Sequence, residues 1–199
     1  VSNGHFKENT LSELCEIFMD DLIGDKQFEK FQEIFPLLIK FIDTSDYLSV
    51  QVHPNDAIAK KKHNVNFGKS EMWYVIDAEA NSQLFAGFSE EMNRESLLKH
   101  IQENTVQDVL QSHSVKAGDV LYIPAGLVHA IGSGVLLAEI QQSSDITYRL
   151  YDWNRGEIDG VKRELHINDA LDAIDYSAKA TIKNFSDASL NKTIPVVKT

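Results

Sequence analysis

Short apolar runs that alternate with polar residues make up the middle of the chain. From Tyr47 onward these runs are rich in β-branched and aromatic residues, and Gly, Pro, Asn, Asp and Ser separate them. Strands of an antiparallel sandwich or barrel show this alternation and this spacing of turns. We therefore predict strands in six segments: YLSVQVH (47–53), EMWYVIDA (71–78), SQLFAGF (82–88), DVLYIP (119–124), GVLLAEIQQ (134–142) and ITYRLYDW (146–153).

The first forty residues show a helical period instead. Apolar residues recur there at steps of three and four, which places them on one face of a helix. A first helix is predicted to begin at a cap formed by Thr10 or Ser12 and to end at Gly24, with Leu11, Leu14, Cys15, Phe18 and Met19 on its apolar face. A second is predicted from about Asp25 to Lys40, kinked or broken at Pro36, with Phe28, Phe31, Ile34, Phe35 and Leu38 on its buried face.

Two later segments also read as helices. A polar stretch from roughly Asn93 to Gln111 interrupts the strands, and a shorter helix is predicted near Ile167 to Ile174. The chain thus divides into a helical segment at 1–45 that we expect to pack on the β domain, a β domain at 46–175, and a weakly patterned tail at 176–199. The predicted fold class is mainly β with a helical N-terminal segment.

Composition and charge narrow the classes of function. The formal net charge is −11 and the sequence pI is about 5.0, which argues against a nucleic-acid partner or an anionic membrane surface. The basic run KKKH at Lys60 to His63 is expected to be a solvated face. The one cysteine, Cys15, excludes an internal disulfide and fits helix packing. Without a bilayer-length apolar run or a visible signal peptide, we expect a cytoplasmic protein.

The most specific chemical signal is GDVLYIPAGLVHAIGSG, residues 118–134. A turn at Gly118 leads into a strand, Pro124 and Gly126 shape a tight turn, and His129 lies on the strand that follows. This run resembles the second conserved motif of the cupins, which are small jelly-roll barrels that hold a metal ion. The resemblance implies a jelly-roll barrel with His129 as a metal ligand, although Ser133 stands where the motif usually ends in Asn.

A second polar pair fits the same reading. In LSVQVHPND, Gln51 and His53 alternate with apolar residues, so both side chains face one way. They stand where the first cupin motif carries its His-x-His pair, and Glu71 is the nearest suitable strand carboxylate beyond an insert at 54–68. One amide, one carboxylate and two imidazoles suit a divalent metal such as zinc with open coordination positions, and manganese or iron are alternatives.

Taken together, QVHPND, GKSEMWYVIDAE, PAGLVHAIGSG and AEIQQSSDITYRLYDWNR resemble the type I phosphomannose isomerases, in particular their short bacterial form. The match spans about Leu48 to Arg155. In that family, residues at the positions of Gln51, His53, Glu71 and His129 bind one zinc ion. The resemblance implies interconversion of mannose 6-phosphate and fructose 6-phosphate through an enediolate.

The resemblance also implies roles for five other positions. Arg149 matches the family's active-site arginine, Glu139 a carboxylate proposed as acid or base, and Lys69 a pocket lysine that shares a strand face with Glu71. Ser49 matches a pocket serine, and Arg155 stands where the longer enzymes have lysine. The spacing does not assign phosphate binding and proton transfer among these residues. The substrate would be a small sugar phosphate, and the sequence leaves the oligomeric state open.

Two other readings are compatible with the same residues. One is a metal cupin of another enzyme class, such as an oxygenase, and the other is a non-catalytic module that binds a sugar phosphate. The chain also begins with Val1 and lacks the family's Ile-Trp-Gly-Gly signature and much of its C-terminal barrel. We therefore expect it to be part of a longer protein, with residues 176–199 beginning a further β region.

Overall fold

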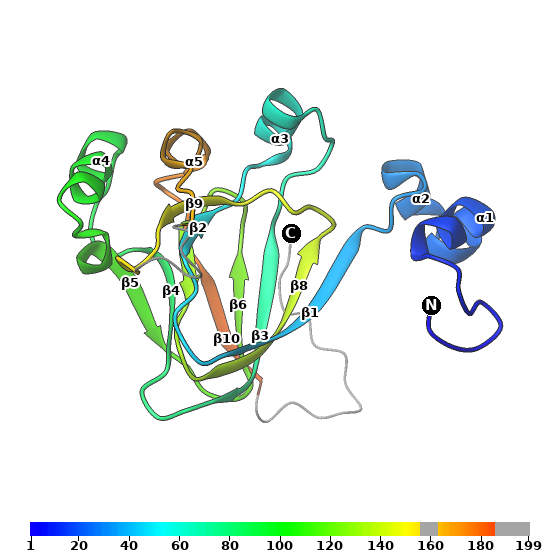
Figure 1. Ribbon diagram of the computed structural model, residues 1–199, viewed down its shortest axis with the longest axis horizontal. Helices are drawn as coiled ribbons and strands as arrows, with labels where there is room; N and C mark the ends of the chain where they lie inside the picture. The colour runs from blue at the N-terminus through cyan, green and yellow to red at the C-terminus, as the bar shows by residue number, and fades with distance from the viewer. Residues whose placement is uncertain (156–162, 186–199) are drawn as a thin grey trace. The chain divides into compact units, whose positions relative to one another are not determined.

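Two antiparallel sheets that face each other form the body of the protein. The computed structural model describes residues 1–155 and 163–185. One sheet has the strand order β1-β8-β3-β6-β10 and the other the order β5-β4-β7-β2-β9 (Figure 1). The strands of the first sheet are β1 (Leu37–Thr44), β8 (Val135–Gln142), β3 (Glu71–Ala78), β6 (Asp119–Ile123) and β10 (Thr181–Asn184); those of the second are β5 (Leu110–Ser114), β4 (Gln83–Phe88), β7 (His129–Ile131), β2 (Val50–Val52) and β9 (Tyr148–Tyr151).

Both faces of the second sheet are buried, and this explains the pattern of β2. Val50 and Val52 belong to a core between this sheet and the helices α4 (Arg94–Gln102) and α5 (Ile167–Ala173). Gln51, between them, faces the other way, toward the space between the two sheets. A second apolar core fills that space, with Trp73, Leu121 and Leu137 among its fully buried members. Polar residues on the inner side of β2 are therefore enclosed by protein.

The six predicted strands and the strand predicted at His129 are confirmed, and three further strands, β1, β5 and β10, were not predicted individually. The register pairs β3 with both β6 and β8, so that Glu71 lies opposite Ile123 on one side and Gln141 on the other. Strand β5 was predicted as the end of a helix; instead α4 ends at Gln102, a short 3₁₀ turn, η1 (Val106–Val109), follows, and the chain then becomes extended. Strand β10 pairs with β6 at the edge of its sheet. Of the predicted tail, residues 186–199 lie outside the described residues.

The predicted second helix is too long by nine residues. The structure has α2 from Asp25 to Phe31, and the segment from Leu37 onward is strand β1. Pro36 explains the change, because proline lacks the amide proton that a helix interior needs and drives the preceding residue toward extended backbone. No residue of α2 is buried, so the predicted apolar face of this helix is wrong as well.

The first helix forms as predicted at its ends. Helix α1 runs from Leu11 to Ile23, and Thr10 and Glu13 cap it reciprocally, with Gly24 at its C-terminus. Leu14 and Cys15 are buried, but Leu11 and Met19 are exposed, and Met19 interrupts the helix with a φ of 45°. Helices α1 and α2 belong to a compact unit at Val1–Leu38, and the sheets belong to a second unit from Ile39 onward.

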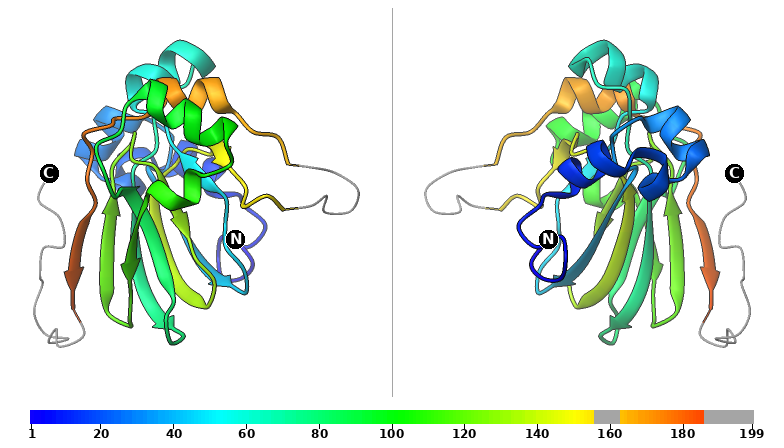
Figure 2. Two further views of the ribbon diagram at one scale, coloured as in Figure 1. Left: turned by 90° about the vertical axis from the view of Figure 1, so that its left-hand side faces the viewer. Right: turned by 90° about the vertical axis from the view of Figure 1, so that its right-hand side faces the viewer.

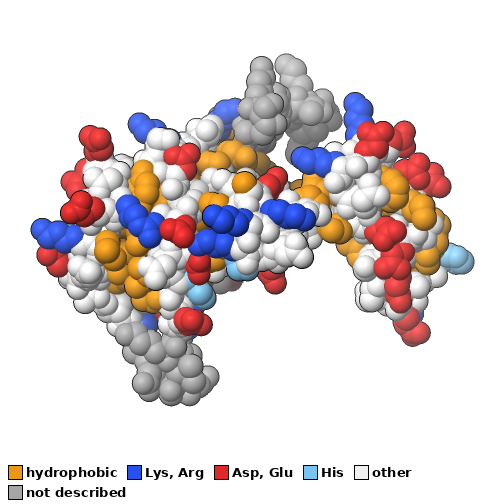
Figure 3. All heavy atoms as spheres, turned by 90° about the horizontal axis from the view of Figure 1, so that it is seen from above, with side chains coloured by type: hydrophobic (Ala, Val, Ile, Leu, Met, Phe, Trp, Pro, Cys, Tyr) orange, Lys and Arg blue, Asp and Glu red, His pale blue; other side chains and the backbone are white. Residues whose placement is uncertain are grey.

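Helices α3 (Asp56–His63), α4 and α5 lie at one end of the facing sheets (Figures 1 and 2). Ion pairs link them there. Lys62 contacts Asp169 at 2.6 Å and Asp172 at 2.8 Å, and Arg94 contacts Asp172 at 2.8 Å. Figure 3 shows basic and acidic side chains intermingled over this end. The run Lys60 to His63 thus forms part of an exposed helix whose charges meet acidic neighbours. No helix in the described part of the chain is long and apolar enough to cross a membrane.

Candidate metal centre

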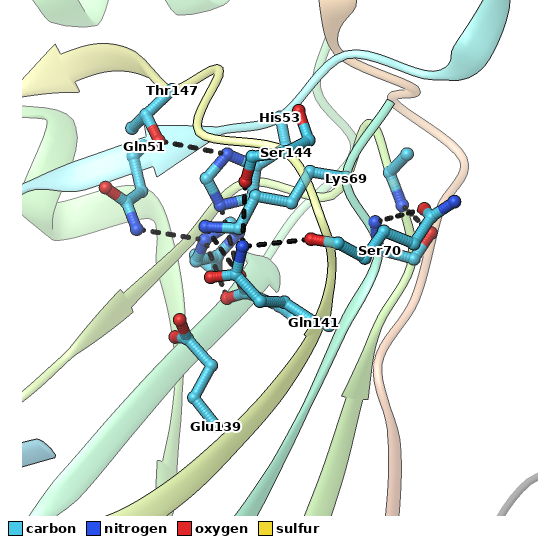
Figure 4. Close-up of polar contacts among 12 residues, drawn as sticks. Gln51, His53, Lys69, Ser70, Glu139, Gln141, Ser144 and Thr147 are labelled. Carbon is cyan, nitrogen blue, oxygen red and sulfur yellow. Dashed lines mark hydrogen bonds and ion pairs between the residues drawn. The ribbon is translucent and has the colours of Figure 1, made fainter. Parts of the chain in front are cut away.

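Three buried side chains from both sheets meet between the sheets. His53 follows β2, His129 begins β7, and Glu71 begins β3. His53 Nε2 lies 3.3 Å from Glu71 Oε2, and His129 Nε2 lies 3.4 Å from Glu71 Oε1. All three side chains are at most 1% exposed. Figure 4 shows His53 directed toward the same region as Gln51 and Lys69. This is the group of residues in the described chain that could hold a metal ion.

The contact that each histidine makes through Nδ1 determines the protonation of Nε2, the ring nitrogen that faces Glu71. His53 Nδ1 lies 2.9 Å from the carbonyl oxygen of Ile146, and His129 Nδ1 lies 2.8 Å from that of Leu127. A carbonyl oxygen only accepts, so each Nδ1 must carry the proton and donate. In a neutral ring Nε2 is then a bare acceptor. The two bare nitrogens face carboxylate oxygens, which also only accept, and a cation between them would satisfy all four atoms.

Two further observations support a cation in this position. His53 Nε2 and Glu71 Oε1 are buried and have no hydrogen-bond partner in the described structure, and Glu71 Oε2 makes an ion-pair contact with Lys69 Nζ at 3.1 Å. Donor atoms about 2.0–2.1 Å from a tetrahedral metal ion lie roughly 3.3–3.4 Å apart, and the two nitrogen–oxygen separations here have this length. The residues therefore fit a small divalent metal ion.

Protonation favours the same conclusion. Burial lowers the pKa of His129 to about 4, although the charge of Glu71 opposes the shift. Burial alone would raise the pKa of the Glu71 carboxyl, but its contacts with His129, His53 and Lys69 outweigh burial and hold this pKa below its ordinary value. At neutral pH the cluster therefore offers an ionised carboxylate and a neutral His129, which are the forms that bind metals.

Gln51 lies beside this cluster but presents its nitrogen. Gln51 Nε2 is 3.3 Å from His129 Nε2, to which it can donate, and the two residues are register partners across β2 and β7. Metal binding would need the amide oxygen on this side. A half-turn of the side-chain amide exchanges the two atoms at little steric change. The structure thus brings Gln51 next to the cluster, with its oxygen turned away.

Lys69 forms the positive side of the cluster. Its Nζ lies 3.1 Å from Glu71 Oε2, and the side chain is 6% exposed. The backbone holds it, because Lys69 N donates to the carbonyl oxygen of Pro54 at 3.0 Å. Pro54 follows His53 directly, so this bond joins the two ends of the insert at 54–68. It thereby fixes His53 and Lys69 relative to each other.

Gly68 makes that close approach possible. A Cβ atom on Gly68 would lie 2.3 Å from the carbonyl oxygen of Pro54 and 2.5 Å from the carbonyl carbon of Asn55. Both contacts are with backbone atoms, which cannot rotate away. The two ends of the insert would therefore have to move apart to accept a methyl group. The glycine therefore belongs to the support of the metal ligands on both sides.

We predict that Gly68→Ala lowers stability by about 1–3 kcal/mol, the usual cost of overpacking. This corresponds to a melting temperature lower by roughly 2–4 °C for each kcal/mol in a chain of this size. Thermal unfolding followed by circular dichroism measures the shift. Lys61→Ala is the control, because Lys61 is exposed in the same insert. An unchanged melting temperature in Gly68→Ala would contradict the prediction.

Arg149 and Ser49 lie together on the same side of β2 and β9. Arg149 is the register partner of Gln51, so the two side chains share a face. Arg149 Nε donates to Ser49 Oγ at 3.2 Å, and Nη1 donates to the carbonyl oxygen of Glu164 at 2.8 Å. The arginine backbone also exchanges two bonds with His166: His166 N donates to Arg149 O, and Arg149 N donates to His166 Nδ1. A half-buried cation is thus firmly held beside Gln51.

Arg155 lies further along the chain, past a strained turn. Trp153 and Asn154 both have positive φ, at 54° and 53°, and Trp153 Nε1 donates to the carbonyl oxygen of Leu48 at 2.6 Å. Arg155 Nε lies 3.7 Å from Asp46 Oδ2, and its Nη2 is buried without a partner among the described residues. One nitrogen of this guanidinium is therefore a buried donor without an acceptor among the described residues.

Glu139 is held by two donors that the sequence did not reveal. Its Oε1 accepts from Lys40 Nζ at 3.0 Å and its Oε2 from Trp73 Nε1 at 3.1 Å. Lys40 Nζ also reaches Gln141 Oε1 at 2.5 Å. Lys40 was missed because it was predicted to end a helix, and Gln141 because one amide in an alternating strand carries no specific signal. Alternation does place Glu139 and Gln141 on the same face of β8, and that signal could have been used.

A hollow of about 620 Å³ lies elsewhere on the described part of the chain. It is lined by residues of β4, of the loop that follows it and of the segment around Tyr176–Ala180. None of the metal-binding candidates lines it.

Two antiparallel sheets that enclose a His-Glu-His cluster define the class of the protein, a cupin-type fold with a candidate metal centre. Comparisons with known proteins narrow this class. Residues 1–74 match the family model for the catalytic domain of type I phosphomannose isomerase. A mannose-6-phosphate isomerase of Bacillus subtilis is 42% identical over 175 residues, which are 88% of this chain and 54% of the relative. One of Streptococcus mutans is 41% identical over 87% of this chain and 53% of the relative.

A solved structure agrees with these matches. The crystal structure of the mannose 6-phosphate isomerase from Bacillus subtilis superposes with a TM-score of 0.80 at 35% identity, and covers 89% of this chain and 55% of that one. The chain thus spans about half the length of the relatives it matches. Over this span, the chain belongs to the type I phosphomannose isomerase family.

Proposed function

We propose that the protein is a zinc-dependent isomerase that interconverts mannose 6-phosphate and fructose 6-phosphate. The observation that carries the proposal is the buried His53–Glu71–His129 cluster, whose acceptor atoms face one another at metal-ligand separations. Relatives at about 42% identity bear the name of this activity. Because the chain spans about half of those relatives, the activity is proposed for the whole protein.

Zinc is the metal that best suits the donor set. Two imidazole nitrogens and one carboxylate oxygen, with a position left for water or substrate, are typical of catalytic zinc sites. The spacing of the donor atoms agrees with a tetrahedral ion. When bound, the metal ion would polarise the sugar oxygens at C1 and C2 and stabilise negative charge there.

The reaction needs further groups from the protein. Isomerisation moves a proton between C1 and C2 through an enediolate, so it requires stabilisation of an oxyanion, proton transfer and binding of a phosphate. Arg149, on the same face as Gln51, is suited to the enediolate oxygen, and the ammonium of Lys69 can donate to a sugar oxygen beside Glu71. Arg155, with a free guanidinium nitrogen, is suited to the phosphate. Ser49 supports this arrangement by accepting from Arg149.

Glu139 has a different environment from a free general base. Both of its oxygens already accept hydrogen bonds, from Lys40 and from Trp73. Both oxygens are thus engaged by donors of the protein, and neither is presented to a substrate without such a partner. We propose that Glu139 supports the site rather than exchanging protons with the sugar.

The test is a coupled assay that follows the formation of fructose 6-phosphate from mannose 6-phosphate. The purified protein is treated with a chelator, and zinc is then returned. We expect turnover that the chelator abolishes and zinc restores, with the Bacillus subtilis isomerase as the positive control. Turnover that survives complete removal of metal would contradict the metal-dependent mechanism.

A second outcome separates catalysis from binding. Stoichiometric zinc with no turnover of mannose 6-phosphate, under conditions in which the Bacillus subtilis isomerase is active, would replace the proposed isomerase with a sugar-phosphate-binding module. Calorimetric titration with mannose 6-phosphate would then detect that binding directly.

A further inference from the structure

Lys40 lies on the edge strand β1, where its side chain is 41% exposed and its ammonium reaches polar residues of the neighbouring strand β8. Along β1, Ile39 and Phe41 are exposed, whereas Lys40 lies between them on the opposite face. Its Nζ contacts Glu139 Oε1 at 3.0 Å and Gln141 Oε1 at 2.5 Å, on the neighbouring strand β8. The lysine therefore ties the edge strand to two polar residues on the inner face of the sheet.

Both residues that Lys40 contacts lie directly beside the metal centre. The register places Gln141 opposite Glu71, and Glu139 opposite Trp73. Directly opposed residues share a face and touch. Trp73 donates its indole N–H to Glu139, and its ring lies edge-on to the ring of His129 with centroids 5.5 Å apart. One path thus leads from Lys40 through Gln141 to Glu71, and another through Glu139 and Trp73 to His129. Figure 4 shows the side chains of Gln141 and Glu139.

The hydrogen bonds of this network are complete only with the lysine. Glu139 is 4% exposed, and its two oxygens accept from Lys40 and Trp73 respectively. The Gln141 amide donates from Nε2 to the carbonyl oxygens of Gln142 and Ser144, so its oxygen faces Lys40. Without Lys40 the buried carboxylate would lose its counter-charge, which is costly for a group removed from water. Glu139 and its neighbour Trp73 would then have to move.

We propose that Lys40 is a positioning residue of the metal centre. Its ammonium orients Glu139 and Gln141, and these hold Trp73 against His129 and line the side of Glu71. The proposal rests on the metal site of the proposed function and not on its sugar substrate. Removal of a residue that supports a metal ligand through hydrogen bonds usually weakens metal binding by about 10–100-fold.

The test is zinc affinity, measured by competition with a chromogenic chelator. Lys40→Met keeps the length of the side chain and removes its charge, and should weaken zinc binding by about 10–100-fold. Lys40→Arg, which keeps a donor and a positive charge, should restore most of the affinity. Lys61→Met is the matched control, because Lys61 is exposed on α3, and it should bind zinc as the unchanged chain does.

A double variant tests the path and covers the case in which Lys40→Met unfolds. Lys40→Met combined with Glu139→Gln removes both charges, so no unpaired carboxylate remains and the fold should persist. Its zinc affinity should equal that of Glu139→Gln alone, since residues in one network are not additive. Additive losses, or Lys40→Met binding zinc as tightly as the unchanged chain, would overturn the inference. Intact zinc affinity with no turnover of mannose 6-phosphate would count against the proposed function alone.

Discussion

Glu71→Gln should abolish tight zinc binding and destabilise the fold at the same time. The substitution keeps the volume of the side chain but removes the negative charge between the two histidines. A neutral amide presents one oxygen, and its NH₂ group would face an Nε2 atom or the nearby Lys69 ammonium. Without the carboxylate, only the two imidazole nitrogens of the three ligands remain to hold the ion. We expect the affinity to fall by at least about 100-fold, the upper end of the range for less direct changes.

The loss of stability has a separate cause. Lys69 is 6% exposed, and its Nζ lies 3.1 Å from Glu71 Oε2. Removing one partner of a buried ion pair strands the other charge, which typically costs about 3–5 kcal/mol. For a chain of this size the melting temperature should fall by roughly 2–4 °C per kcal/mol. Glu91→Gln, the same change at an exposed carboxylate, controls for the substitution itself.

The two effects can be separated by a second substitution. Combining Glu71→Gln with Lys69→Met removes the stranded ammonium, so stability should partly return while zinc binding stays lost. Thermal unfolding of the metal-free proteins measures the first effect, and chelator competition measures the second. Glu71→Gln with unchanged melting and unchanged zinc affinity would show that this cluster is no metal centre.

The strands of the two sheets could be predicted because a strand that is buried on one face alternates apolar and polar residues in the sequence. EMWYVIDA and GVLLAEIQQ alternate, and the structure has β3 at Glu71–Ala78 and β8 at Val135–Gln142. Gln51 and His53 stood out because polar side chains replaced apolar ones at positions that a sheet would bury. The interruption of a strong pattern was the informative signal, and these side chains lie beside or within the metal cluster.

Strand β1 shows where the local pattern failed. The apolar residues from Phe28 to Leu38 keep a helical spacing across Pro36, so the segment read as one helix. In the structure the segment from Leu37 forms an edge strand because its backbone pairs with β8, about one hundred residues later in the chain. Pairing over that distance leaves no trace in the period of an eleven-residue window. Because strand β1 was not predicted, the contact of Lys40 with Glu139 and Gln141 was not predicted either.

The network behind the metal ligands depends on register for the same reason. That Gln141 lies opposite Glu71, and Glu139 opposite Trp73, follows from the alignment of β3 with β8. A shift of one residue would turn every side chain to the other face. Residue types and spacing indicated a set of candidate residues, but only the paired sheets specify which of them touch.

Arg149→Ala should remove most of the turnover while leaving the metal in place. Arg149 is held beside Gln51 by Ser49, by the carbonyl oxygen of Glu164 and by the backbone N–H and ring Nδ1 of His166. It forms no hydrogen bond with any of the four atoms that face one another in the cluster, so zinc affinity should stay within a few-fold of that of the unchanged protein. Loss of one donor to a developing oxyanion usually lowers kcat by about 10²–10³, and we expect a decrease of this order.

The ratio of kinetic constants then assigns the role of the arginine. If Arg149 stabilises the enediolate, Arg149→Ala lowers kcat with little change in KM, because the interaction forms mainly in the transition state. Arg155→Ala should do the reverse and raise KM, since a phosphate is bound equally in the ground and transition states. Arg149→Lys should recover only part of the activity, because an ammonium cannot reproduce the planar fork that bonds to Ser49 and Glu164 together. A rise in KM alone for Arg149→Ala would instead make Arg149 the phosphate ligand and would exchange the proposed roles of the two arginines.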